Sequence, residues 1–187
     1  NFERKFDPND PNNETKVKNL SEVIIGQIEV ISRVATAFSE FAQLPKRNDE
    51  EINLNREIRN VLTIFSDENI FIHANNDNIK KKIDKDYLAR IIINLVTNAS
   101  QAKADNRKSV INVDIEKIEK RIKIIVDDNG VGISPDKLGK IFDPNFTSKN
   151  SGMGIGLTMV KRMVEDYNGT ITVVSEVDKG ATFTISM

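Results

Sequence analysis

The sequence predicts an α+β fold that follows one long helix. Two observations lead to this prediction. Apolar residues recur at heptad spacing in the first part of the chain, and short strand patterns alternate with helical patterns after it. Of the 187 residues, 39 % are hydrophobic and 29 % are charged, so the chain can bury a core and is not expected to be disordered throughout.

The first 46 residues are predicted to be part of a helical hairpin. An amphipathic helix is expected from about Glu14 to Leu44, and Pro45 ends it. Its stripe is typical of a dimerisation bundle; packing on its own domain is the alternative. The chain does not begin with Met, which suggests a fragment. The stripe consists of Val17, Leu20, Ile24, Ile28, Ile31, Val34, Ala35, Phe38, Phe41 and Ala42, with Gln27 as a polar exception.

Residues 47–187 are predicted to form the second domain, after a charged linker. Asp84 is expected to cap a long helix, and Ser134-Pro135 to open a short one. Strands 109–117 and 121–127 alternate apolar and polar residues and are expected to pair antiparallel. The other predicted elements are strands 52–54, 70–74, 79–83, 170–175 and 181–186 and helices 56–65, 84–104 and 155–167.

Composition excludes several kinds of site. The chain has no cysteine, so thiolate zinc sites and disulfides are excluded, and its single histidine, His73, excludes a multi-histidine metal site. With 27 basic and 28 acidic residues the net charge is −1, which argues against a dedicated nucleic-acid binder. The sequence contains no apolar run of about 20 residues that could span a membrane.

Four local patterns carry candidate chemistry. Asn94 and Asn98 lie four residues apart, on one helix face, and an amide oxygen can bind Mg²⁺. Asp128 precedes two glycines, so its carboxylate can accept a hydrogen bond from an exocyclic amine while the loop approaches a ligand closely. Hydroxyls and a lysine follow Phe142, and three glycines between Gly152 and Leu157 precede a helix whose N-terminus can hold an anion. Each pattern alone also fits a structural role.

Together these patterns resemble the N, G1, F and G2 boxes of sensor histidine kinases, in the ATPase group that includes gyrase, the Hsp90 chaperones and the MutL repair proteins. The matching stretches are 94–99, 128–133, 142–149 and 152–157, and the ending 180–185 is similar to the closing strand of that domain. The helix ending at Pro45 resembles the second dimerisation helix of nitrogen-regulation type kinases. The resemblance implies a two-layer sandwich, with a mixed, mostly antiparallel sheet and helices on one face.

The resemblance also implies the ligands and the site. ATP and Mg²⁺ are the expected cofactors, with Asn98 as the metal ligand, Asp128 on the adenine amine, and residues 147–149 as a lid over the phosphates. Asn94, Asn98 and Lys149 are the expected catalytic residues. The residues expected to bind the nucleotide are Asn94, Asn98, Gln101, Asp128, Gly130, Gly132, Ile133, Thr147, Ser148, Lys149, Gly152, Met153, Gly154, Ile155, Gly156, Leu157 and Thr182.

The implied reaction is transfer of the ATP γ-phosphoryl group to a histidine and then to an aspartate of a response regulator, in a homodimer joined through helix 14–44. The domain is expected to be cytoplasmic, in a parent protein that can be membrane-anchored. No acceptor histidine is expected in this chain, because His73 lies in a predicted strand. Gln101 and Ala102 stand where many relatives have Lys and Tyr, so Lys149 or Lys103 would supply the cation. Pro45–Glu51 is the expected hinge.

Three alternatives stay open from sequence alone. An anti-sigma type serine kinase lacks the heptad helix, and a gyrase-like or MutL-like ATPase would carry a glutamate base where Asn94 stands. The third is a degenerate domain that dimerises and binds a regulator without catalysis.

Overall fold

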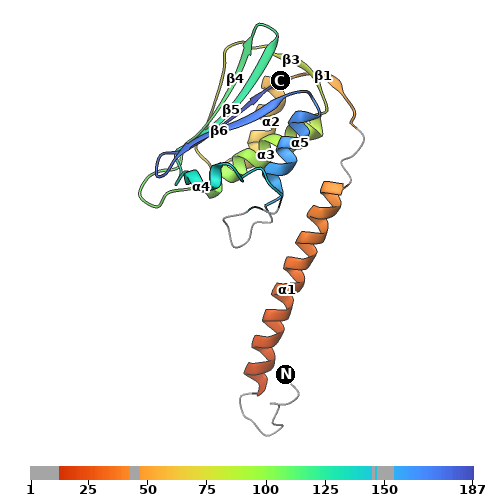
Figure 1. The fold of residues 1–187 in the computed structure, drawn as a ribbon, viewed down its shortest axis with the longest axis vertical. Helices are drawn as coiled ribbons and strands as arrows, with labels where there is room; N and C mark the ends of the chain where they lie inside the picture. Colours follow the sequence, from red (N-terminus) through yellow and green to blue (C-terminus); the bar gives the residue numbers. More distant parts are fainter. Residues whose placement is uncertain (1–12, 43–46, 145, 147–153) are drawn as a thin grey trace. The chain divides into compact units, whose positions relative to one another are not determined.

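A computed structural model describes residues 13–42, 47–144, 146 and 154–187 (Figure 1). In the first helix the side chains of residues 14, 29, 30 and 33–42 are outside this description. The chain divides into two compact units, Asn1–Leu44 and Pro45–Met187. Among the described residues, no helix has the length and apolarity needed to cross a membrane.

The first unit contains helix α1 (Asn13–Ala42), so the predicted long helix is confirmed. Its 30 residues contain no proline, and the apolar residues at heptad spacing leave a stripe that this unit does not bury. The exposed aliphatic side chains are Val17, Leu20, Val23, Ile24, Ile25, Ile28 and Ile31.

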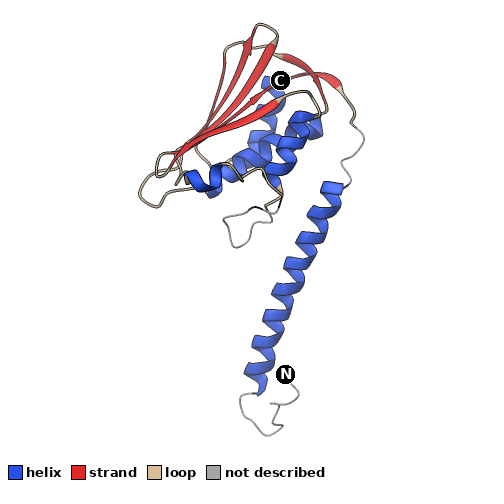
Figure 2. Ribbon diagram, viewed as in Figure 1, coloured by secondary structure: helices blue, strands red, loops and turns tan. Residues whose placement is uncertain are grey.

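The second unit is a two-layer sandwich, which confirms the predicted fold class (Figure 2). One sheet has the strand order β2-β4-β5-β7-β6, in which β2 is parallel to β4 and every other pair is antiparallel. A separate antiparallel pair joins β1 to β3. The strands are β1 (Glu50–Asn53), β2 (Ile70–Ala74), β3 (Lys80–Ile83), β4 (Ile111–Ile118), β5 (Arg121–Asp128), β6 (Thr170–Glu176) and β7 (Gly180–Ser186).

Helices cover one face of the large sheet (Figure 1). They are α2 (Leu54–Leu62), the 3₁₀ turn η1 (Thr63–Phe65), α3 (Lys85–Gln101), the short α4 (Pro135–Leu138) and α5 (Gly156–Glu165). Alternate residues of β4 and β5 point toward these helices, so the core lies between the two layers. Its fully buried members include Leu54, Ile58, Leu88, Ile91, Ile92, Leu95, Val113, Ile115, Ile124, Val160, Met163 and Ile185.

Asp84 caps α3, as the sequence predicted. Its Oδ1 accepts hydrogen bonds from the main-chain N–H of Asp86 (2.8 Å) and Tyr87 (3.2 Å), and its Oδ2 accepts one from Asn48 (2.6 Å). Burial raises the pKa of this carboxyl, but the three N–H donors outweigh burial, so the net shift is downward. The cap therefore also ties the chain before β1 to the start of α3.

The same corner holds an aromatic cluster just after α5. Tyr167 contacts the Tyr87 ring edge to face, with centroids 6.1 Å apart, and the Arg47 guanidinium lies 4.7 Å from the Tyr167 ring centre. Arg47 also donates a hydrogen bond to the carbonyl of Asp166 (2.5 Å). The prediction of a hinge that extends to Glu51 is therefore wrong, because Arg47 and Asn48 are hydrogen-bonded to Asp166 and Asp84 within the second unit and Glu51 belongs to β1.

Some helices and strands begin or end at other residues than the sequence predicted. Leu54, expected in a strand, begins α2, because the Asn53 side chain accepts a hydrogen bond from the N–H of Arg56 (3.0 Å) and caps the helix. The predicted helix 56–65 ends as α2 at Leu62 and continues as η1. The long helix expected to reach Ala104 ends at Gln101.

Candidate functional site

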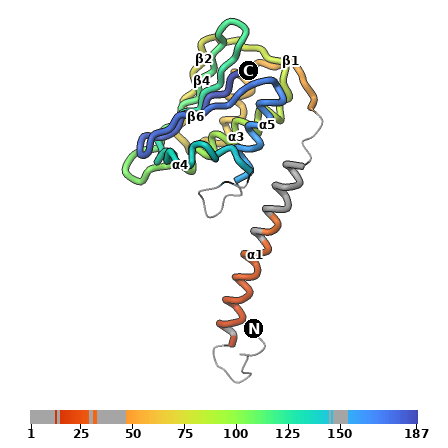
Figure 3. The backbone as a smooth tube through the Cα atoms, in the orientation of Figure 1, coloured from red at the N-terminus to blue at the C-terminus, as the bar shows by residue number. Residues whose placement is uncertain are grey.

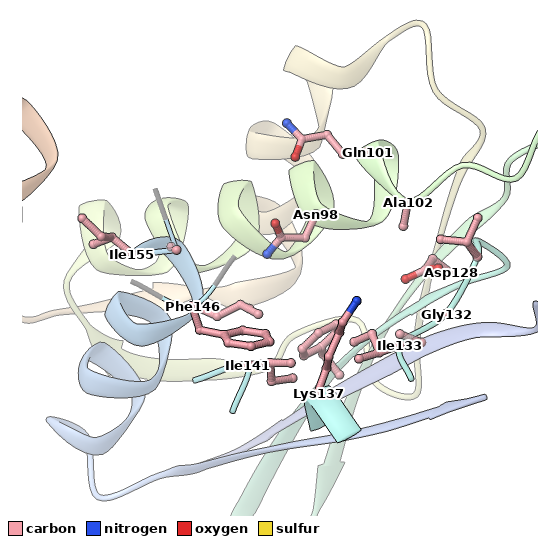
Figure 4. Close-up of a pocket in the computed structure, with 16 residues that line it drawn as sticks. Asn98, Gln101, Ala102, Asp128, Gly132, Ile133, Lys137, Ile141, Phe146 and Ile155 are labelled. Atoms are coloured by element: carbon pink, nitrogen blue, oxygen red, sulfur yellow. The ribbon is translucent and has the colours of Figure 1, made fainter. Parts of the chain in front are cut away.

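A cavity of about 480 Å³ lies between α3, the loop after β5, α4, the start of α5 and β7 (Figure 4). Its size is in the range that small-molecule and cofactor sites occupy. The residues that line it are Asn98, Gln101, Ala102, Asp128, Val131, Gly132, Ile133, Lys137, Ile141, Phe146, Gly154, Ile155, Gly156, Leu157, Ala181 and Phe183. Described residues of all four motifs, which are far apart in the sequence, thus meet around one space.

The two asparagines of α3 have different positions. Asn98 lines the cavity, and Gln101, near the end of the helix, lines it too. Asn94, one turn earlier, is not among the lining residues. Its amide nitrogen donates to the carbonyl of Arg90 (2.8 Å), and its Oδ1 lies where a side chain on Gly156 would begin, 2.5 Å from that Cβ position. Asn94 thus packs against the first residue of α5.

Asp128 lies at the end of β5 with 6 % of its surface exposed, and it lines the cavity. Its Oδ1 accepts a hydrogen bond from the N–H of Gly130 (2.8 Å), which turns the chain out of the strand. Gly130 itself lies behind the cavity wall, because a Cβ there would be 2.2 Å from the carbonyl oxygen of Ala102. The predicted Asp-Gly loop therefore presents a buried carboxylate to the cavity.

The cavity wall beside Asp128 is apolar. Ile133, Ile141, Ala181 and Phe183 line it, and Ile141, Ala181 and Phe183 are each at most 6 % exposed. Gly132 lines the same region with φ +71°, a conformation that L side chains rarely adopt. A flat ring with an exocyclic amine would bury its faces here and could present the amine to the carboxylate.

Thr182, expected at the adenine edge, is not in the cavity. It pairs with Asp127 in the ladder and donates a hydrogen bond to Oδ1 of that residue (2.6 Å), on the opposite face of the sheet from Asp128. The physical reason is the two-residue period of a strand, which turns Ala181 and Phe183 toward the cavity and Thr182 away from it. The residues of β7 that face the cavity are therefore Ala181 and Phe183.

The N-terminus of α5 forms the other end of the cavity. Gly154, with φ +65°, and Ile155, Gly156 and Leu157 line it, and no described side chain caps this helix. Its first-turn N–H groups and the positive end of the helix dipole make this end suitable for an anion. The other residues expected here, Thr147, Ser148, Lys149, Gly152 and Met153, lie outside the described residues.

Sequence reasoning missed Lys137. This residue of α4 lines the cavity, and Figure 4 shows its side chain pointing toward Asn98 and Asp128. Among the described lining residues it is the one cation. Lys103, considered as a substitute cation, instead forms an ion pair with Glu68 at 2.8 Å and does not line the cavity. The hydrogen bonds from Lys103 and Ser100 lower the pKa of Glu68.

The residues fit a magnesium nucleotide better than a metal ion alone. Asn98 offers one amide oxygen to the cavity, and the described residues contain no group of three or more His, Cys, Asp or Glu side chains that could hold a metal ion. Mg²⁺ usually takes only one or two protein ligands and completes its shell with water and phosphate oxygens. Asn98 would hold the ion together with a phosphate chain.

Residues 83–187 match the family model described as histidine kinase-, DNA gyrase B- and HSP90-like ATPase. The sensor histidine kinase ZraS of Escherichia coli (strain K12) is 33 % identical over 172 residues, which cover 89 % of this chain and 37 % of ZraS. An NtrY-like sensor histidine kinase of Rickettsia bellii is 29 % identical over 186 residues, which cover 97 % of this chain and 30 % of that protein. The chain thus spans about a third of the length of these relatives.

Solved structures show the same fold. The catalytic domain of histidine kinase ThkA superposes with a TM-score of 0.67 at 27 % identity, over 75 % of this chain and 95 % of that domain. A second structure of ThkA, in complex with response regulator protein TrrA, covers all of this chain and 54 % of ThkA with a TM-score of 0.71 at 23 % identity. The family model covers more than half of the chain, and the chain belongs to the family of histidine kinase-, DNA gyrase B- and HSP90-like ATPases.

Proposed function

We propose that this chain is the ATP-binding catalytic portion of a sensor histidine kinase of the nitrogen-regulation type. The observation that carries the proposal is the cavity itself, which has a buried carboxylate against an apolar wall at one end and the N-terminus of α5 at the other. Such a site suits a molecule with an aminated aromatic ring and a polyanionic tail. The match to an ATPase family model supports ATP as that molecule.

Each part of the cavity has a role in this proposal. Asp128 accepts a hydrogen bond from the adenine amine, and the apolar wall covers the ring. Asn98 holds Mg²⁺ on the phosphates, while the first turn of α5 and Lys137 neutralise their charge. Positioning and charge neutralisation are the main contributions of a protein to phosphoryl transfer. The lid role of Thr147, Ser148 and Lys149 stays a prediction from the resemblance.

The phosphoryl acceptor lies outside this chain in the proposal. His73 is an exposed residue of β2, on the face of the sheet opposite the helices, and it does not line the cavity. Asn94 carries an amide, which cannot act as a general base toward water. Transfer to a histidine of a helical hairpin, rather than ATP hydrolysis, is the reaction that suits this residue.

Helix α1 supports a homodimer in the same proposal. Seven aliphatic side chains on its described part are at least 39 % exposed, more apolar surface than a lone helix is expected to leave in water. A second copy of the hairpin would cover this stripe. The expected downstream partner is a response regulator, supported by the ThkA structure that was solved with one. A cytoplasmic position in a membrane-anchored parent also remains part of the proposal.

Calorimetric titration with ATP, with and without Mg²⁺, tests the proposal. Wild-type protein should bind ATP, Asp128→Asn should lose most of that affinity, and Asn98→Ala should lose the contribution of Mg²⁺. Thr182→Val is a matched control, because Thr182 is close in sequence to the cavity but on the outer face of the sheet. Wild-type affinity in both site variants, with unchanged circular dichroism, would refute the site.

A further inference from the structure

Arg107 lies in the connection between α3 and β4 and binds three main-chain carbonyls. Its Nε donates to the carbonyl of Asn129, and its Nη2 donates to the carbonyls of Gly130 and Asp178, each at 2.6 Å. The five N–H groups of a guanidinium form a rigid planar fork, and hydrogen bonds from such a charged donor are among the strong ones. Three segments far apart in the sequence are thus joined at one side chain.

Two of these segments build the adenine end of the cavity. Asn129 and Gly130 lie between Asp128 and the lining residues 131–133, and Asp178 lies in the turn that leads into β7. Figure 3 shows the three segments at the same end of the sheet. Arg107 itself does not line the cavity, so its effect on a ligand must pass through the loop that it holds.

The loop and the turn approach each other closely. The N–H of Asp178 donates to the carbonyl of Val131 (2.8 Å), and a Cβ on Gly132 would lie 2.1 Å from the carbonyl oxygen of Glu176. Asp178 has φ +62°, an uncommon conformation for a residue with a side chain. Such a conformation persists where surrounding bonds fix it, and the bond from Arg107 is one of them.

Asn129 adds a second connection to the same loop. Its Oδ1 accepts a hydrogen bond from the N–H of Val110 (2.9 Å), and its Nδ2 donates to the carbonyl of Lys108 (2.9 Å). Both ends of the loop that begins at Asp128 are therefore tied: one to residues 107–110, and the other, through the Val131 carbonyl, to the turn at Asp178. The carboxylate of Asp128 has little freedom to move relative to β7.

We propose that Arg107 is a positioning residue that sets base selectivity by fixing the Asp128 loop against the β6–β7 turn. The inference rests on the proposed function, since it assigns the adenine end of the ATP site. Without the guanidinium, three carbonyls lose their shared donor and the loop opens. Asp128 then moves away from the position in which it distinguishes an exocyclic amine from a carbonyl oxygen.

Comparing ATP with inosine triphosphate tests this inference, because inosine carries a carbonyl oxygen where adenosine carries the amine. Arg107→Met keeps much of the apolar length of the side chain and removes the donors. It should raise the ATP dissociation constant by about tenfold, as expected for losing charged hydrogen bonds, and should reduce the ATP-to-inosine triphosphate preference. The ratio of ADP to ATP affinity should not change, because the phosphate end is untouched.

Arg121→Met is the matched control, since Arg121 is exposed at the start of β5 and away from the cavity. Arg107→Lys keeps the charge but replaces the fork by a single ammonium, so it should restore only part of the preference. A purely structural role would lower the folded fraction and leave the nucleotide preference unchanged. The proposal would be overturned if Arg107→Met kept the wild-type preference for ATP over inosine triphosphate. If the Met variant does not fold, the same comparison is made with Arg107→Lys.

Amide hydrogen exchange separates this inference from the proposed function. In Arg107→Met the amides of Gly130 and Val131 should exchange faster than in wild type, whether or not a nucleotide binds. Wild-type protein that binds no nucleotide would refute the proposed function, and exchange would then decide whether Arg107 holds the loop. Unchanged exchange at these amides would refute the positioning role.

Discussion

The hydroxyl of Tyr167 donates a hydrogen bond to Oδ1 of Asp49 (2.5 Å), and the Tyr167 hydroxyl oxygen accepts a hydrogen bond from the N–H of Asp84 (3.0 Å). One phenol thereby connects the chain before β1, the residue after α5 and the cap of α3. These bonds fix residues 47–49 to the second unit. The described part of the predicted hinge, residues 47–51, is therefore held within the second unit.

The alkaline stability of the protein should depend on Tyr167. Burial, together with the hydrogen bond to Asp49, raises its pKa to about 12. Below pH 10 both folded and unfolded states hold the proton, and the phenol contributes its full stability. Between about pH 10 and 12 the unfolded state loses its proton first, so the free energy of unfolding should fall.

Urea unfolding of wild type and Tyr167→Phe at pH 7 and pH 11 measures this effect. At pH 7 the variant should be less stable by about 1 kcal/mol, because loss of the hydroxyl leaves two part-buried groups, the Asp49 carboxylate and the Asp84 N–H, without this partner. The stability difference between the proteins should shrink at pH 11. Burial also raises the pKa of Tyr87, so both proteins should lose some stability at alkaline pH. A difference that grows at pH 11 would contradict the assignment.

Lys137→Met should weaken ATP binding more than adenosine binding. The proposal places the ammonium beside the phosphates, and an exposed charge pair contributes about 1 kcal/mol or less, which corresponds to about fivefold or less in affinity. The effect should decrease at high salt. Lys140→Met is the control, since Lys140 follows α4 and does not line the cavity. An equal loss for adenosine would place Lys137 at the base instead.

Gly132→Ala should destabilise the second unit by about 2 kcal/mol or more, since its φ of +71° and the close Glu176 carbonyl both oppose a Cβ. Gly139→Ala is a matched control from the same region. Its φ is −69° and nothing lies within 4 Å of the added Cβ, so its effect should be neutral or slightly stabilising. Thermal unfolding of both variants compares them, and equal midpoints would show that the loop can move.

The elements that local chemistry determines were predictable from sequence. Asp84 caps α3 because its side chain and the helix it starts are adjacent in the chain, and the four-residue spacing of Asn94 and Asn98 fixes their shared face. Features that depend on tertiary packing were not predictable. Lys137 reaches the cavity only because the four-residue α4 packs beside it, and Arg107 acts on carbonyls that carry no sequence pattern.

Strand register explains the remaining error at the site. The resemblance that predicted Thr182 near the nucleotide gives the position of this residue along β7. It does not give the face of the sheet, because neighbouring residues of a strand point to opposite faces. The pairing of Ala181 with Asp128 settles which face each residue takes. Such pairing depends on residues more than fifty positions apart, so the periodicity of β7 alone could not supply it.

The contact between Tyr87 and Tyr167 has a practical consequence. The chain has no tryptophan and two tyrosines, and both tyrosines lie in this corner with ring centres 6.1 Å apart. Ultraviolet fluorescence of the unlabelled protein therefore comes almost entirely from the place where residues 47–49 join the ATP-binding unit. A change in emission reports on that junction, and occupancy of the nucleotide cavity needs a separate label to be seen directly.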